Sequence, residues 1–190
     1  HGGYWFSPRL TKRNYSFCIE PIVAAGAVVA SLEYDLCPDV SMDRIVDQVR
    51  HACAWLWRNV ESHGGDPSRI HVTGHSAGGH LSAMMATTDW PSFQAGLPDD
   101  MLKSIIPVSG LFELEPFRLS SLNETLKLDE EAASRNSPRY LKPTRKMPIS
   151  VIVGGGETDE FRRQSRDFAA DWYGLAESME YIETAGHDHF

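Results

Sequence analysis

A serine flanked by small residues is the strongest chemical signal in the sequence. Ser76 lies in the pattern Gly74-His75-Ser76-Ala77-Gly78, between an apolar run and a stretch of small residues suited to a buried helix. A strand, a sharp turn and a helix in this order expose a serine hydroxyl as a nucleophile. The pattern therefore predicts acyl transfer, with Ser76 as the attacking group.

The first residues, His1-Gly2-Gly3, fit a second requirement of acyl transfer. Two glycines allow a backbone to approach a substrate carbonyl closely and to direct N–H groups at the oxyanion that develops on it. We expect Gly2, Gly3 and the N–H of Ala77 to form this oxyanion hole. The alternative interpretation is an ordinary turn at the end of the chain.

A serine nucleophile needs a base and an orienting carboxylate, in the chain order serine, acid, histidine. Glu157, Asp159 and Glu160 follow an apolar, strand-like run. Thr158 can cap a helix, which places Asp159 and Glu160 in its first turn, where acidic residues are favoured for structural reasons alone. Glu157 is therefore the expected acid, and Asp159 is the alternative.

Two histidines near the end of the chain, His187 and His189, compete for the role of base. His75, although adjacent to the nucleophile, is expected to point the wrong way along the turn. A metal site on His187 and His189 would need further ligands, and no Cys/His cluster provides them. We therefore expect no metal and no cofactor.

Strand-like and helix-like segments alternate along the chain, which predicts an α/β fold with a mostly parallel sheet and helices on both faces. Strands are expected at 27–34, 69–73, 105–108, 149–153 and 179–182. Helices are expected from the cap Ser41 to Gly64, at 77–87 and 161–173, with a short one near 129–134. Residues 1–190 are treated as one domain, in which 111–147 form an insertion near the active site.

The composition is that of an ordinary globular chain, with 42% hydrophobic and 23% charged residues and a net charge of −8. This charge would repel nucleic acid, and no run approaches the roughly 20 apolar residues of a membrane span. Three cysteines, Cys18, Cys37 and Cys53, cannot all pair, so we expect reduced thiols and a cytoplasmic location. The expected partner is a small-molecule substrate, and a homodimer is left open.

Several segments together resemble the kynurenine formamidase (arylformamidase)-like branch of the α/β-hydrolases, over the whole chain. They are HGGYW at 1–5, YDLCP at 34–38, GHSAGGH at 74–80, the stretch from LNE at 122–124 to Pro138, EFRRQS at 160–165 and DHF at 188–190. The family's catalytic histidine directly precedes Phe, which selects His189. Its acid lies three residues before the E-F-x-R-Q-S run, which selects Glu157, although some members have Asp there.

The resemblance implies a serine hydrolase that cleaves a carboxylic ester or an aryl formamide such as N-formylkynurenine through an acyl-enzyme. Tyr4, Trp5, Phe112 and Phe117 are expected to line the substrate pocket, with ordinary core packing as the alternative. Two other functions stay open. One is a general carboxylesterase or thioesterase without formamidase activity, and the other is a non-catalytic binding module of the same fold.

The resemblance also implies that parts of the fold are missing. In the α/β-hydrolase sheet the HGG loop follows a central strand, but nothing precedes His1 in this chain. The strands at 27–34 and 69–73 would then face each other across an unpaired gap. We therefore expect an internal fragment, incomplete at both ends and lacking its N-terminal strands.

Overall fold

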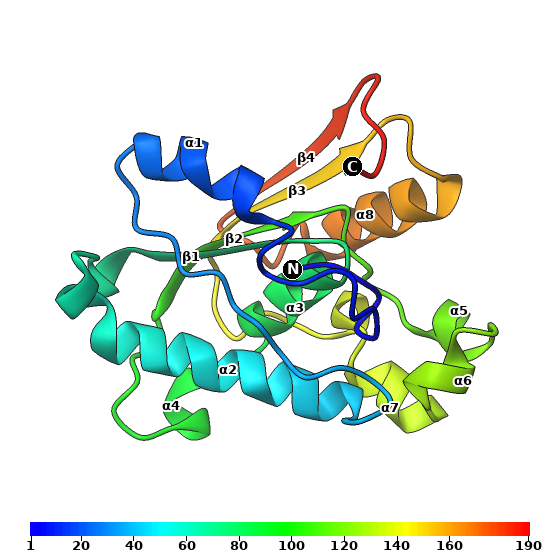
Figure 1. The fold of residues 1–190 in the computed structure, drawn as a ribbon, viewed down its shortest axis with the longest axis horizontal. Coiled ribbons are helices and arrows are strands. Elements are labelled where there is room, and N and C mark those ends of the chain that lie inside the picture. Colours follow the sequence, from blue (N-terminus) through cyan, green and yellow to red (C-terminus); the bar gives the residue numbers. More distant parts are fainter.

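A four-stranded parallel sheet forms the centre of the computed structural model, which describes residues 1–190 (Figure 1). Its strands lie side by side in chain order: β1 (Ile70–His75), β2 (Leu102–Val108), β3 (Pro148–Gly154) and β4 (Ser178–Thr184). Parallel neighbours need a crossover connection, and each connection here contains at least one helix. The four strands expected from residue 69 onward are confirmed.

Helices α3 (Ala77–Ala86) and α8 (Asp159–Trp172) pack against one face of this sheet. Ile105, Ile149 and Val151 point to this face and are buried with Phe168 and Trp172 of α8. On the opposite face Thr73 and Ile182 remain exposed.

Helix α2 (Met42–Asn59) lies outside α3, as Figure 1 shows along the lower edge of the molecule. The Ser41 side chain accepts a hydrogen bond from the Arg44 amide, which satisfies one of the unpaired donors at the helix start. Ile45, Val46 and Val49 repeat at helical spacing and are buried in the main core. The expected helix after Ser41 is therefore confirmed, and it ends five residues before Gly64 with a short 3₁₀ turn between them.

The stretch 111–147 contains only short helices. They are α5 (Glu115–Arg118), α6 (Asn123–Leu126), α7 (Glu130–Arg135) and a 3₁₀ turn at Pro138–Tyr140. Helix α7 is the helix expected near 129–134. The stretch is held to α8 by Gln164, whose Oε1 accepts hydrogen bonds from the Phe112 and Glu113 amides at 2.7 and 3.0 Å.

The expected strand at 27–34 is wrong. These residues follow α1 (Ile19–Ala24) and belong to no strand, because the sheet ends at β1 and no ladder of hydrogen bonds reaches them. An apolar, β-branched run forms a strand only where a neighbour pairs with its N–H and C=O groups.

The remaining helix, α4 (Trp90–Phe93), is short. None of the helices is long and apolar enough to cross a bilayer.

Candidate active site

Ser76 occupies the sharp turn between β1 and α3. Its backbone has φ 57° and ψ −119°, a conformation that a non-glycine residue rarely adopts. The turn needs small neighbours: a Cβ on Gly74 would lie 2.3 Å from the Gly78 carbonyl oxygen. The Ser76 amide donates to the Val108 carbonyl at 2.8 Å, which fixes the turn against the end of β2.

The His1-Gly2-Gly3 segment lies directly against this turn. A Cβ on Gly2 would lie 3.1 Å from the Ser76 Cβ, so only glycine allows the two backbones to approach this closely. The Tyr34 hydroxyl donates to the His1 carbonyl at 2.7 Å, and the Gly3 carbonyl accepts from the Ser7 amide at 2.9 Å. Gly2 and Ala77, the first residue of α3, thus lie beside Ser76, and Gly3 follows Gly2 in the chain.

Glu157 and His189 are joined by a hydrogen bond of 2.6 Å between Oε2 and Nδ1. The Glu157 side chain is completely buried, and that of His189 is 22% exposed. The other carboxylate oxygen, Oε1, accepts from the Gly154 amide at 2.9 Å and from the Ser109 hydroxyl. A carboxylate held in this way keeps the proton of a neutral His189 on Nδ1 and leaves Nε2 able to accept one.

The two competing residues lie elsewhere. The Asp159 side chain is fully exposed, and its Oδ1 lies 3.5 Å from Arg162 Nη1. His187 is exposed, and its Nδ1 lies 3.0 Å from the Ala185 carbonyl of its own turn. Of the carboxylates after β3 and the two histidines near the end of the chain, the structure brings together Glu157 and His189.

The expectation that His75 points away from this site is wrong. Its ring lies 4.4 Å from the His189 ring, measured between centroids, and its Nδ1 lies 3.1 Å from the Tyr15 hydroxyl. Burial, and next the positive charge that His189 can carry, lower the pKa of His75 to about 4. His75 is therefore a neutral ring in contact with His189 at neutral pH.

The aromatic residues expected to line a substrate pocket divide into two groups. Trp5 and Phe112 have no exposed surface, so the structure places them in the core instead. Trp5 donates from Nε1 to His80 Nδ1 at 3.1 Å, and Phe112 stacks on Phe168. A residue type alone cannot distinguish these positions from a pocket wall, because aromatic side chains fill cores and line pockets alike.

Tyr4 and Phe117 form the second group, with ring centroids 6.2 Å apart. Phe117 is 8% exposed and packs edge-on against Trp5, with centroids 5.9 Å apart, so it belongs to the core. Burial, and next the negative charge of Glu157, raise the pKa of Tyr4. Tyr4 is therefore the one of these aromatic residues that is partly exposed and close enough to Glu157 to be affected by its charge.

All these groups gather at the edge of the sheet where the parallel strands end. Ser76 follows β1, Ser109 follows β2, Glu157 follows β3 and His189 follows β4. No hydrogen bond joins Ser76 to His189 in this state, and such bonds often tighten only when a substrate is present. Sequence reasoning missed Ser109 and Tyr15, although a polar residue directly after the apolar β2 run was a usable signal for Ser109.

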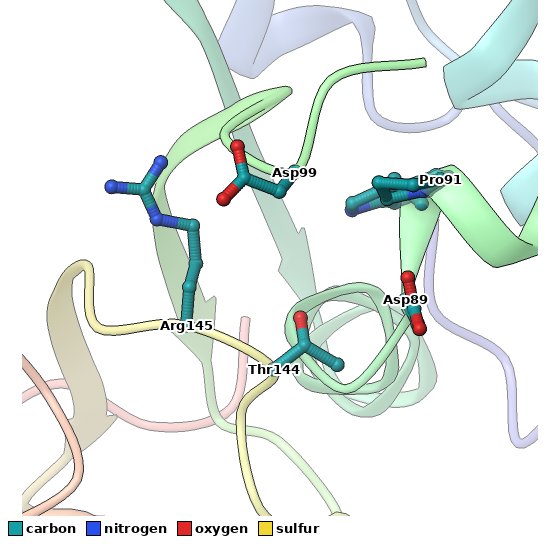
Figure 2. Close-up of a pocket in the computed structure, with 6 residues that line it drawn as sticks. Asp89, Pro91, Asp99, Thr144 and Arg145 are labelled. Atoms are coloured by element: carbon teal, nitrogen blue, oxygen red, sulfur yellow. The ribbon is translucent and has the colours of Figure 1, made fainter. Parts of the chain in front are cut away.

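A separate surface hollow of about 280 Å³ lies at the opposite edge of the sheet. Figure 2 shows Asp89, Asp99, Thr144 and Arg145 around it. Asp99 precedes β2 and Arg145 precedes β3, whereas Ser76 follows the carboxyl end of β1. The hollow is therefore distinct from the site around Ser76. Nowhere in the structure is a group of three or more His, Cys, Asp or Glu residues placed to hold a metal ion.

Comparison with known proteins gives a consistent result. A model of the family described as α/β hydrolase fold matches residues 1–190. The chain is 36% identical to kynurenine formamidase of Salmo salar, over 99% of this chain and 61% of that protein. It is also 36% identical to esterase LipC of Mycobacterium tuberculosis, over 99% of this chain and 51% of that protein.

Solved structures agree on the fold. A proposed thioesterase from a Silicibacter species superimposes with a TM-score of 0.84 at 28% identity, over 100% of this chain and 66% of that one. The carboxylesterase EstE1, from a metagenomic library, superimposes with a TM-score of 0.80 at 21% identity, over 100% of this chain and 69% of that one. The chain spans 61–64% of the length of the kynurenine formamidases that it matches. It belongs to the α/β-hydrolase fold family.

Proposed function

We propose that Ser76, Glu157 and His189 form the catalytic centre of a serine hydrolase that cleaves a carboxylic ester or an aryl formamide. The observation that carries the proposal is the hydrogen bond of 2.6 Å between Glu157 and His189, at the same edge of the sheet as the strained Ser76. A buried carboxylate that orients an imidazole beside a strained serine turn is the arrangement that nucleophilic acyl transfer requires.

In the acylation step, Ser76 Oγ attacks the substrate carbonyl carbon while His189 Nε2 takes the hydroxyl proton. Glu157 stabilises the imidazolium that forms, and backbone N–H groups of Gly2, Gly3 and Ala77 stabilise the oxyanion. The tetrahedral intermediate then collapses and the bond to the leaving group breaks. His189 gives its proton to the departing alcohol or arylamine, and the acyl group stays on Ser76.

In the deacylation step, His189 takes a proton from water as the water oxygen attacks the acyl carbon. The second tetrahedral intermediate collapses to release a carboxylic acid, or formic acid from a formamide, and the proton on His189 returns to Ser76. The substrate loses one acyl bond and gains the elements of one water molecule in the full cycle.

We place an aryl formamide of the N-formylkynurenine type first among the substrates. Support comes from the similarity to kynurenine formamidases of Salmo salar and Danio rerio, at 36% and 35% identity. The partly exposed Tyr4 offers an aromatic surface beside the site for an arylamine leaving group. A general carboxylesterase is the second candidate, because LipC is an esterase at equal identity.

The test uses the full-length protein with a fluorophosphonate probe and two substrates, N-formylkynurenine and p-nitrophenyl acetate. We expect the probe to label Ser76 and both substrates to be hydrolysed. Ser76→Ala should abolish labelling and lower kcat by at least about a thousandfold, since the triad acts as a unit. Ser62→Ala, in an exposed turn after α2, is the matched control and should behave as the unchanged protein.

The outcomes separate the candidate functions. Labelling with hydrolysis of the ester alone would favour the general esterase. Absence of labelling together with absence of hydrolysis would contradict the proposal and favour a non-catalytic binding module of the same fold.

A further inference from the structure

The His189 ring is in contact with three other rings: that of the adjacent Phe190, with centroids 5.0 Å apart, and two that come from other elements. Its centroid lies 4.4 Å from that of His75, at the end of β1, and 4.4 Å from that of Phe161, in the first turns of α8. The two flanking rings make no contact with each other, so they pack against His189 from different sides. We call His75 and Phe161 the ring clamp.

Each half of the clamp is fixed by its own neighbours. His75 Nδ1 lies 3.1 Å from the Tyr15 hydroxyl, and Tyr15 in turn lies next to Gly2. Phe161 packs against the main core from α8. The clamp therefore links the glycine segment, the serine turn and α8 to a single imidazole.

Glu157 alone does not fix this imidazole. Its hydrogen bond holds Nδ1 but leaves the ring able to turn about the Oε2–Nδ1 axis, and the side chain is still 22% exposed. The ring must face Ser76 when a proton moves, because misplacement of a base by about 1 Å can cost about a hundredfold in rate. Packing on two sides restricts the rotation that the single hydrogen bond allows.

We propose that His75 and Phe161 are positioning residues that hold His189 in its working orientation, and that the Phe161 ring also stabilises the imidazolium formed during acylation. The second effect follows because a cation beside an aromatic ring is attracted by the charge distribution of the ring. The proposal rests on the proposed function, in which His189 is the base.

The charged and titratable groups around His189 come from several elements. Glu157 faces it from the turn after β3, His75 from β1, and Asp188 precedes it on its own segment. The negative charge of Glu157 also acts on the Tyr4 hydroxyl. A substitution at Phe161 removes none of these charged and titratable groups. A change in the pH profile of a Phe161 variant can therefore be assigned to the loss of the ring.

The first experiment compares Phe161→Leu and Phe161→Tyr by the pH dependence of kcat/KM on p-nitrophenyl acetate. Leucine keeps apolar packing but removes the aromatic ring, so we expect kcat to fall about fivefold and the acid limb of the profile to move about 0.5 pH units lower. Tyrosine keeps the ring and should restore both properties. A simple packing role would leave the acid limb of Phe161→Leu unchanged, and that result would overturn the proposal for Phe161.

The second experiment replaces His75 with Gln, which can still bond to Tyr15 but has no ring. We expect kcat to fall about tenfold with KM within about twofold of the unchanged protein, because the substitution acts through the base rather than through substrate binding. An unchanged kcat would overturn the proposal for His75. Phe93→Leu is the matched control, since Phe93 packs on His51 with centroids 4.9 Å apart, away from the site.

A measurement that does not depend on hydrolysis separates the clamp from the proposed function. The proton NMR titration of His189, assigned by its absence in His189→Gln, should shift to lower pH in Phe161→Leu and not in Phe93→Leu. If the titration shifts but the fluorophosphonate probe does not label the protein, the hydrolase proposal is contradicted and the ring clamp is supported. Normal hydrolysis with no shift in either the titration or the acid limb would contradict the clamp alone.

Discussion

Ser109 and Glu157 are joined on the side of the carboxylate that faces away from His189. The Ser109 hydroxyl donates to Glu157 Oε1, while Oε2 bonds to the imidazole. Ser109 adopts φ 49° directly after β2, so an unusual backbone conformation aims this hydroxyl at the acid. A buried carboxylate is thereby held at both oxygens, as its desolvation requires.

Removal of the Ser109 hydroxyl should leave the Glu157 carboxylate less firmly held without unfolding the chain. In Ser109→Ala, Glu157 Oε1 keeps only the Gly154 amide, and loss of a hydrogen bond to a buried charge costs about 1.5–3 kcal/mol. We expect kcat to fall about tenfold and the urea midpoint to decrease, measured with p-nitrophenyl acetate and by fluorescence. Ser150→Ala, which removes a surface bond of 3.0 Å to Glu180, is the control and should change neither quantity; equal losses in both variants would contradict the assignment.

The identity of the acid is tested by a pair of conservative changes. Glu157→Gln keeps the size of the side chain but removes the charge that orients His189, and the corresponding loss in a serine protease is about 10⁴ in kcat. We expect a loss of at least about a thousandfold. Asp159→Asn should have no effect, because this side chain is fully exposed. Single-turnover kinetics of both variants would decide, and the reverse result would make Asp159 the acid.

Much of this arrangement was predictable because it depends on local chain properties. The Gly-x-Ser-x-Gly turn needs small residues between a strand and a helix, and the chain order of Ser76, Glu157 and His189 follows from the order of strands whose ends share one edge. The helix after Ser41 was likewise predictable, since its cap and its buried spacing both lie within the segment itself.

The failures concern features that depend on neighbours far away in the sequence. The run 27–34 has strand-like residues but no paired neighbour, so the same composition gives an unpaired segment. Trp5 and Phe112 have the residue type of a pocket wall, yet their direction into the core is set by tertiary contacts. The contact of His75 with His189 likewise arises only when the segment that follows β4 folds back towards the end of β1.

The close approach of Gly2 to Ser76 gives a third prediction. In Gly2→Ala the new Cβ would lie 2.4 Å from the Tyr15 hydroxyl and 3.1 Å from the Ser76 Cβ, so the glycine segment must move away. Displacement of an oxyanion donor costs about 10²–10³ in kcat. Gly174→Ala places its Cβ in open space and should be neutral. A Gly2→Ala enzyme with unchanged kcat would remove this segment from the oxyanion hole.

The last prediction concerns the stability of the core beneath the site. His80 is completely buried, accepts from Trp5 Nε1 at Nδ1 and donates from Nε2 to the Asn136 carbonyl at 2.8 Å. Burial lowers the pKa of His80 from 6.5 to about 4. A proton added at Nδ1 would face the Trp5 N–H donor, so the folded state strongly favours the neutral ring.

Because the pKa is lower in the folded chain, the unfolded chain binds more protons between pH 6.5 and pH 4. The contribution of the neutral His80 to the free energy of unfolding is complete above pH 6.5. It is lost as the pH falls towards 4, by an amount on the order of 3 kcal/mol. His80→Gln can make both hydrogen bonds but does not titrate, so its free energy of unfolding should fall less steeply over this range. Urea unfolding at several pH values tests this, with the exposed His63→Gln as control. Parallel curves for His80→Gln and the unchanged protein would show that His80 does not control the acid sensitivity.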